Sequence, residues 1–232
     1  MKSSEFDKFA DEYRSLHQAT LTASGETPEY FAEYKMKDLK RLVRGTAPSV
    51  DRGQFLDFGG GVGTSVPFFR KYFPDARLTC VDVSLKSLEV GATRFGEHTS
   101  FVAFDGIWLP FAEDTFDCAF AACVFHHIPS KAHEGLFTEI RRVLKPDGFL
   151  MVYEHNPLNP LTVRTVNACP FDENAVLITA SMLRARVENS GFRGLRTRYR
   201  VFFPKRLHWL RVMEDRLAWL PMGAQYFVCG RK

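Results

Sequence analysis

The sequence lacks the long apolar run that a membrane-spanning helix requires. Such a helix needs about 20 consecutive apolar residues, and no run in this chain of 232 residues approaches that length. The opening residues, MKSSEFDKFADEY, contain no apolar signal segment. We therefore expect no stable membrane insertion, no secretion and a cytoplasmic location.

Cysteine is scarce and unpatterned. The chain has five cysteines, an odd number, and no C-x-x-C pair. Cys80, Cys118 and Cys229 stand in apolar, strand-like runs, so we expect reduced, buried thiols and no disulfide framework. Apart from the adjacent His126 and His127, no residues have the spacing of metal ligands. The sequence therefore predicts no metal site.

Acidic residues are sparse near the C-terminus. From Arg184 onward there are 12 Lys and Arg against 3 Asp and Glu, although the whole chain has a formal net charge of only +4. Such a region suits an anionic substrate, nucleic acid or a membrane surface, or is an ordinary solvated surface. Arg196, Arg198 and Arg200 alternate, which predicts three guanidinium groups on one face of a strand. They would bind an anionic group of a substrate, or they would protect a sheet edge.

Strand and helix signals alternate from residue 54 onward. Apolar, strand-like runs end at Phe58, Asp82 and Asp105, a fourth occupies residues 115–128 and a fifth residues 149–155. Helical patterns separate these runs. The alternation predicts a parallel, doubly wound α/β sheet, and such sheets bind ligands beyond the carboxyl ends of their strands.

The stretch LDFGGGVGTS joins the first predicted strand to a helix. Gly59, Gly61 and Gly63 allow a ligand to approach the backbone closely, and the helix N-terminus adds unpaired N–H groups. A dinucleotide fingerprint would place glycine where the chain has Thr64. Asp57 precedes the glycines, which suits a ligand carrying an ammonium group. Both features argue against a dinucleotide-dependent oxidoreductase.

Acidic residues end three successive predicted strands, at Asp57, Asp82 and Asp105. Because these ends share one rim of the sheet, the three carboxylates fit an adenosine-like ligand that lies across it. Asp82 would accept hydrogen bonds from ribose hydroxyls and Asp105 from the adenine amino group. Asp57 would lie near a cationic amino-acid tail.

Five motifs in order, LDFGGGVGTS, VDVS, FDGIWLPFAEDTFD, VFHHI and RRVLKPDGFLMVYEH, resemble the motif series of class I S-adenosylmethionine-dependent methyltransferases. The resemblance covers about residues 50–157 and is strongest to the small-molecule branch that includes ubiquinone/menaquinone-type methyltransferases. It implies a Rossmann-like sheet of seven strands, mostly parallel with an antiparallel last strand, and helices on both faces. It also implies one domain, with a helical lid at 1–46, a cofactor-binding core at 50–157 and a substrate-side region at 158–232.

The resemblance further implies S-adenosyl-L-methionine as the cofactor and assigns residues to its parts. The implied contacts are Tyr13 of the lid and Asp57, Gly59, Gly61 and Gly63 for the methionine part, Asp82 and Val83 for the ribose and adenine, Asp105 and Gly106 for the adenine edge, and Val124 and Phe125 near the methyl group.

Methyl transfer from a sulfonium depends mainly on in-line positioning, but an oxygen or nitrogen acceptor must also lose a proton. His126 and His127, which follow the fourth strand, are the predicted bases. Glu154, His155 and Asn156, at the end of the fifth strand, are the predicted acceptor contacts. The Asn- and Pro-rich segment 155–175 is long for a connection and is predicted to cover the acceptor.

Residues 205–221 have leucines and a methionine at helical spacing. This pattern predicts an amphipathic helix that packs on the core or on a second subunit, or that covers a lipid-like acceptor.

Together these features predict a methyltransferase that acts on a small, partly hydrophobic and anionic acceptor as a monomer or homodimer. RNA methylation is an alternative because the C-terminal region is basic. However, no RNA-binding module is recognisable, and the place of a base-stacking N/D-P-P-aromatic motif reads FHHIP. A non-catalytic regulatory module that binds the cofactor is a second alternative, and no nucleic-acid partner is expected.

Overall fold

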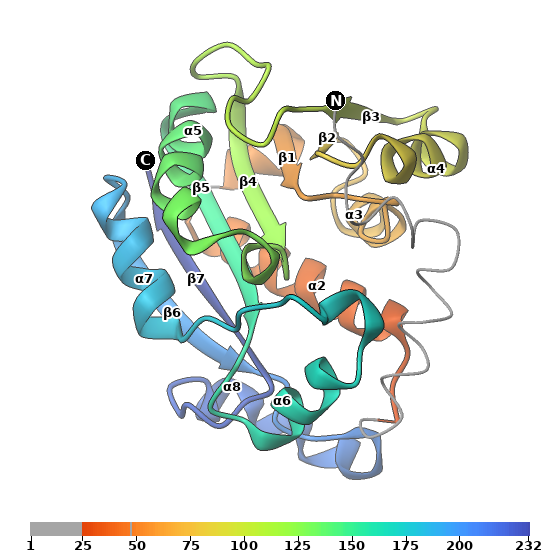
Figure 1. Ribbon diagram of the computed structural model, residues 1–232, viewed down its shortest axis with the longest axis vertical. Helices are drawn as coiled ribbons and strands as arrows, with labels where there is room; N and C mark the ends of the chain where they lie inside the picture. Colours follow the sequence, from red (N-terminus) through yellow and green to blue (C-terminus); the bar gives the residue numbers. More distant parts are fainter. Residues whose placement is uncertain (1–24, 47) are drawn as a thin grey trace.

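The computed structural model describes residues 25–46 and 48–232, which form a central sheet with helices on both faces (Figure 1). The sheet has seven strands in the order β3-β2-β1-β4-β5-β7-β6. The strands are β1 Gln54–Phe58, β2 Arg77–Asp82, β3 Thr99–Ala103, β4 Phe116–Ala122, β5 Leu144–His155, β6 Arg193–Arg200 and β7 Gln225–Arg231. The described α-helices are α2 Pro28–Thr46, α3 Val66–Tyr72, α4 Leu85–Phe95, α5 His133–Val143, α6 Pro160–Asn167, α7 Ala180–Asn189 and α8 Glu214–Leu217.

The pairing of the strands confirms the predicted doubly wound sheet. Strands β1 to β5 pair in parallel, whereas β7 lies antiparallel between β5 and β6. The chain winds outward from β1 through β2 to β3 and then restarts at β4 on the other side of β1. The reversal between β1 and β4 is where doubly wound sheets form a ligand-binding crevice.

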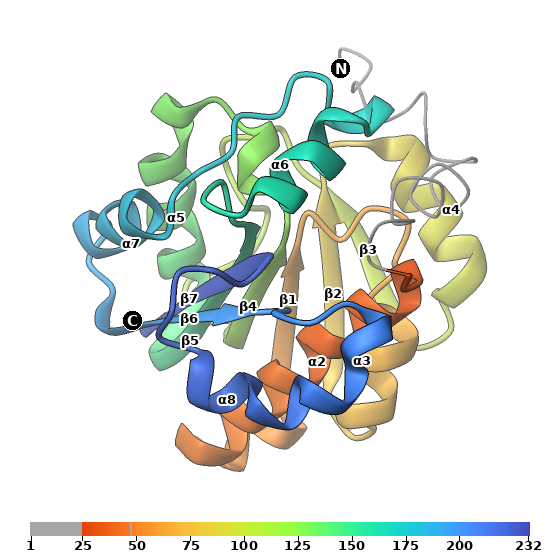
Figure 2. The ribbon, with the colours of Figure 1, turned by 90° about the horizontal axis from the view of Figure 1, so that it is seen from below.

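Two layers of helices cover the sheet because successive side chains of a strand point to opposite faces. Phe55 packs in one apolar cluster with side chains of α2 and α3, and its neighbour Leu56 packs in another with side chains of α5 and α7. Figure 2 shows these two pairs of helices on opposite sides of the sheet. Within the described residues, none of the helices combines the length and the apolar character needed to cross a membrane.

Four predicted elements differ from the structure. Strand β3 ends at Ala103, before Asp105. Strand β4 ends at Ala122, before the predicted end at residue 128. Strand β5 begins at Leu144, before the predicted start at residue 149, and the chain turns within it at Asp147, whose φ is 61°. The predicted amphipathic helix at 205–221 is a 3-10 segment, Lys205–Met213, followed by the short α8. The large apolar side chains of the 3-10 segment include Trp209 and Val212, which are exposed. The prediction of an amphipathic helix that packs on the core is therefore wrong.

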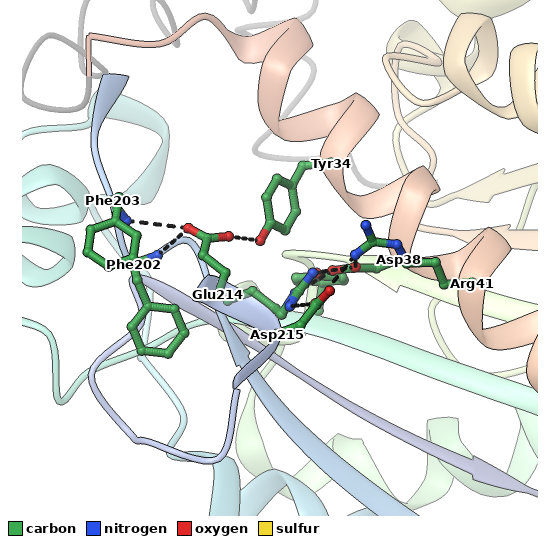
Figure 3. A network of polar contacts seen from close by, with 9 residues as sticks. Tyr34, Asp38, Arg41, Phe202, Phe203, Glu214 and Asp215 are labelled. Atoms are coloured by element: carbon green, nitrogen blue, oxygen red, sulfur yellow. Dashed lines mark hydrogen bonds and ion pairs between the residues drawn. The ribbon is translucent and has the colours of Figure 1, made fainter. Parts of the chain in front are cut away.

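A buried polar network joins α2 to the C-terminal region (Figure 3). The guanidinium group of Arg200 donates to both carboxylate oxygens of Asp38, with Nε–Oδ2 at 2.8 Å and Nη2–Oδ1 at 2.7 Å, and to Asp215 at 2.8 Å. Tyr34 donates a hydrogen bond to Glu214, which also accepts from the backbone N–H of Phe202. The network therefore fixes the segment that follows β6 against α2.

This network overturns part of the prediction for the three alternating arginines. Arg200 is only 5% exposed and is paired with Asp38, so it is neither a free substrate anchor nor a solvated edge residue. Arg196 and Arg198 are exposed on β6, the edge strand.

Candidate functional site

A cavity of about 630 Å³ lies at the carboxyl ends of β1, β2, β4 and β5. Its volume falls within the range of about 300–1,000 Å³ that is usual for small-molecule sites. The far wall comes from α2, from the segment that contains α6 and from residues 201–204. In Figure 1 that α6 segment lies beyond the arrowhead of β4, and its residues line the cavity.

The glycine turn after β1 forms the floor of one half of the cavity. Gly59 and Gly61 both have positive φ, 75° and 50°, a backbone conformation that glycine adopts readily. A Cβ on Gly59 would lie 2.6 Å from the side chain of Val124, whereas one on Gly61 would have its nearest contact 3.8 Å away at Asp82. The turn thus packs against β4 at Gly59 and leaves open space at Gly61.

The carboxylate of Asp82 is held in place by the backbone. Its Oδ2 accepts from the N–H of Gly61 and its Oδ1 from the N–H of Ser84, both at 2.9 Å. The side chain lines the cavity beside Val83, which is 38% exposed. Ser84 also caps α4 by accepting from the N–H of Ser87. The acid at the end of β2 is therefore oriented before any ligand binds.

Asp57 lies beneath the glycine turn and is 2% exposed. Burial raises the pKa of this carboxyl to about 7, against the opposing effect of the hydroxyl of Ser65, which donates a hydrogen bond to it. Among the described residues, the positive charge of Lys35 also lowers this pKa, but too little to offset burial.

The other half of the cavity has a cluster of histidines and carboxylates. Glu154, at the end of β5, is completely buried and accepts from the backbone N–H groups of Val124 and Phe125 at 3.1 and 2.7 Å. Its second oxygen lies 2.6 Å from Nδ1 of His126. The turn that follows β4 thus holds Glu154 in place, and Glu154 in turn orients the imidazole ring of His126.

Asp172 completes this cluster from the segment after α6. Its Oδ1 lies 3.5 Å from Nε2 of His126 and 3.2 Å from Nε2 of His127. Burial opposes charge on His126, but the carboxylates on either side of its ring outweigh burial and raise its pKa to about 10. Burial lowers the pKa of His127 and, together with the nearby His126, lowers the pKa of His155 to about 4.

Many of the residues selected from the sequence surround this one cavity. Those that line it are Asp57, Gly59, Gly61, Asp82, Val83, Gly106, Val124, His126, His127 and His155. Tyr13 lies outside the described residues.

Two predicted cofactor contacts do not line the cavity. Gly63 faces away from it, because a Cβ there would meet the aromatic rings of Phe95 and Phe101. Asp105 is exposed, and its Oδ1 accepts from the N–H groups of Ile107 and Trp108 at 2.8 and 2.7 Å. The carboxylate of Asp105 therefore stabilises a turn instead of facing the cavity.

Three further predicted contacts lie behind the cavity wall. Phe125 is fully buried and stacks on Phe137 with ring centroids 4.2 Å apart. Glu154 does not line the cavity itself but contacts two residues that do, Val124 and His126. The side-chain amide of Asn156 donates to the carbonyl oxygens of Pro221 and Gly223, so it joins β5 to the chain before β7. These side chains support the site without facing its interior.

The structure adds lining residues that the sequence did not identify individually. Lys35 of α2 and Cys123 after β4 line the cavity, as do Phe202 and Phe203. Asp172 had no distinguishing signal, because its partners lie far away in the sequence. From α6 and its flanks the lining residues are Asn159, Leu161, Thr162, Thr165, Val166 and Cys169.

Comparison with known proteins identifies related sequences. Residues 56–152 match the family described as "Methyltransferase domain". The ubiquinone/menaquinone biosynthesis C-methyltransferase UbiE of Hahella chejuensis is 29% identical over 123 residues, 50% of this chain and 49% of that protein. The demethylmenaquinone methyltransferase of Renibacterium salmoninarum is 30% identical over 158 residues, 66% of this chain and 63% of that protein. The matched region thus spans about half to under two thirds of these curated relatives.

Solved structures show the same fold. A protein of Thermotoga maritima, described as an S-adenosylmethionine-dependent methyltransferase and possible histamine N-methyltransferase, has a TM-score of 0.66 at 18% identity, over 98% of this chain and 97% of that one. Phosphoethanolamine N-methyltransferase 2 of Haemonchus contortus, in complex with S-adenosyl-L-methionine, has a TM-score of 0.65 at 16% identity, over 100% of this chain and 60% of that one.

Proposed function

We propose that this chain is a class I S-adenosylmethionine-dependent methyltransferase and that it transfers a methyl group from that cofactor to a small-molecule acceptor. The observation that carries the proposal is the pair of half-sites in one cavity. One half holds the glycine turn and Asp82, and the other holds the histidine–carboxylate cluster.

The residues of the first half fit the cofactor. The ordered carboxylate of Asp82 would accept hydrogen bonds from the ribose hydroxyls, and Val83 and Gly106 would contact the adenine. The open space at Gly61 would admit the methionine part. Asp57, whose burial no cation of the described residues offsets, would interact with the ammonium group of that part.

The bound cofactor supplies a methyl group that its sulfonium already activates, so the main task of the protein is alignment. The α6 segment and residues 202–204 wall off the cavity on the acceptor side. The buried network around Asp38 holds the backbone of Phe202 through Glu214. These contacts keep the two half-sites in a fixed relation and limit the entry of water.

The second half suits an acceptor that is partly apolar and has a polar nucleophile. Leu161, Val166 and Phe202 contribute apolar surface, and Lys35 supplies a cationic side chain for an anionic group. The cluster built on His126, His127 and Asp172 faces the same space, and we assign to it the activation of the acceptor. The three alternating arginines do not line the cavity. We therefore assign the polar part of the acceptor site to this cluster instead.

Replacing Asp82 by alanine should weaken the binding of S-adenosylmethionine by about 1–3 kcal/mol, the cost of losing hydrogen bonds to a charged acceptor. Isothermal titration calorimetry measures this change. Asp75→Ala is the matched control, because Asp75 is an exposed acid that pairs only loosely with Arg52, at 3.6 Å. Equal affinities of a folded Asp82→Ala variant and the wild type would exclude the ribose role.

Binding of the cofactor should also depend on pH through Asp57. Because the pKa of Asp57 is about 7 in the ligand-free chain, a cationic ligand that prefers the carboxylate must displace a proton below that pH. Affinity should therefore rise between about pH 5.5 and 7, by up to about tenfold per pH unit, and should level off above. Calorimetry in two buffers of different ionisation enthalpy measures the released proton. The proposal for Asp57 fails if Asp57→Asn retains the same pH dependence.

A further inference from the structure

Three potential metal ligands converge on the acceptor side of the cavity. One ligand atom each from His126, His127 and Asp172 lies within 4.8 Å of the other two. In a tetrahedral zinc site with bonds of about 2.0–2.1 Å, neighbouring ligand atoms are about 3.3 Å apart. The observed separations of Asp172 Oδ1 from the two Nε2 atoms are 3.5 Å and 3.2 Å, so both match the spacing of neighbouring ligands around one ion. The ligand atoms of the two histidines lie within 4.8 Å of each other.

Glu154 has the position of an outer partner of a metal-bound histidine. A metal-ligating imidazole usually donates its second N–H to a carboxylate or carbonyl, which fixes the tautomer and the ring orientation. Nδ1 of His126 lies 2.6 Å from Glu154, so a proton on Nδ1 leaves the lone pair of Nε2 directed at Asp172 and the cavity. Glu154 cannot easily turn away, because two backbone N–H groups hold its other oxygen.

The balance of charge at this place also favours a cation. Glu154 and Asp172 are 0% and 8% exposed, and burying two carboxylates requires compensating positive charge. A protonated His126 between them supplies one positive charge, which leaves the group with one net negative charge. A divalent ion on Asp172 would offset both carboxylates and would allow His126 and His127 to be neutral, as metal ligands must be.

We propose that His126, His127 and Asp172 bind a divalent transition-metal ion, with Glu154 as the positioning residue of His126. Two imidazoles and one carboxylate favour zinc or iron over magnesium or calcium, which prefer oxygen ligands. All three ligands line the cavity, so a remaining coordination position faces the acceptor and takes an oxygen or nitrogen atom of it. Binding of the ion is independent of the proposed function, whereas its use on the acceptor rests on that function.

The test uses Zn²⁺ as the probe on the full chain after dialysis against a chelator and without S-adenosylmethionine. Calorimetry should show one Zn²⁺ per chain, with affinity reduced at least about 100-fold in Asp172→Asn and in His127→Gln. Glu154→Gln should reduce affinity about 10–100-fold, the usual effect of losing an outer partner. Asp75→Asn and His98→Gln are matched controls, because both residues are exposed and lie away from the cavity. Visible absorption of the Co²⁺ form should change in the ligand variants and stay constant in the controls.

Absence of stoichiometric Zn²⁺ binding by folded wild-type protein would overturn the proposal, and so would unchanged affinity in Asp172→Asn. Thermal unfolding checks that each variant is folded. If a ligand variant does not fold, the wild-type titration still tests the proposal. A chain that binds Zn²⁺ through these residues but transfers no methyl group would contradict the proposed function and leave the metal site standing. A chain that transfers methyl groups at the full rate without the ion would contradict only its use on the acceptor.

Discussion

The Asp38→Ala variant is expected to lose about 3–5 kcal/mol of stability, the usual cost of removing one partner of a buried ion pair. The reason is that Arg200 is 5% exposed and directs two of its N–H groups to Asp38. Without that carboxylate the guanidinium charge stays buried, and among the described residues the exposed Asp215 is its remaining ion-pair partner. Tyr153 would also lose the acceptor of its hydrogen bond.

Denaturant unfolding measures the loss directly, and the melting temperature should fall by roughly 10 °C in a chain of this size. The exposed Asp75→Ala variant should change stability by less than about 0.5 kcal/mol. A loss below about 1 kcal/mol in Asp38→Ala would show that the network does not hold α2 to the C-terminal region.

Replacing His127 by alanine should lower turnover at least about 100-fold, since activation of an acceptor by a positioned side chain contributes about 10²–10⁴-fold. Affinity for S-adenosylmethionine should stay unchanged, because His127 belongs to the acceptor half of the cavity, next to Asp172. Steady-state kinetics and calorimetry on the same preparation separate the two quantities. His98→Ala is the control, because this histidine is exposed. If His127→Ala turns over at the wild-type rate, the cluster does not activate the acceptor.

The fold could be predicted from the sequence because its signals are local. The apolar runs that became β1 and β2, the glycine turn between β1 and α3, and the cap at Ser84 each depend on neighbouring residues. The same holds for the acid at Asp82, which a strand end places on the rim of the sheet. The order of motifs thus predicts three residues that line the half of the cavity that we propose for the cofactor, Gly59, Gly61 and Asp82. Gly63 and Asp105 belong to the same motifs and do not line it.

The acceptor half could not be predicted in the same way because long-range contacts create it. Asp172 meets His126 only after α6 has folded back over the sheet, and Arg200 meets Asp38 across most of the chain. Alternation along β6 indicated a row of arginines but could not show that one of them is buried. The position of Asn156 at a strand end indicates an acceptor contact, but its side-chain amide donates instead to carbonyl groups before β7.

The measurement that tests the central claim most directly is the transfer of a labelled methyl group from S-adenosylmethionine to small molecules of a metabolite extract. We expect purified wild-type chain to label a low-molecular-weight product, and we expect the same preparation to leave added RNA unlabelled. Cofactor binding without any labelled product would contradict the account and favour a regulatory module. Label that appears only in RNA would contradict the small-molecule acceptor.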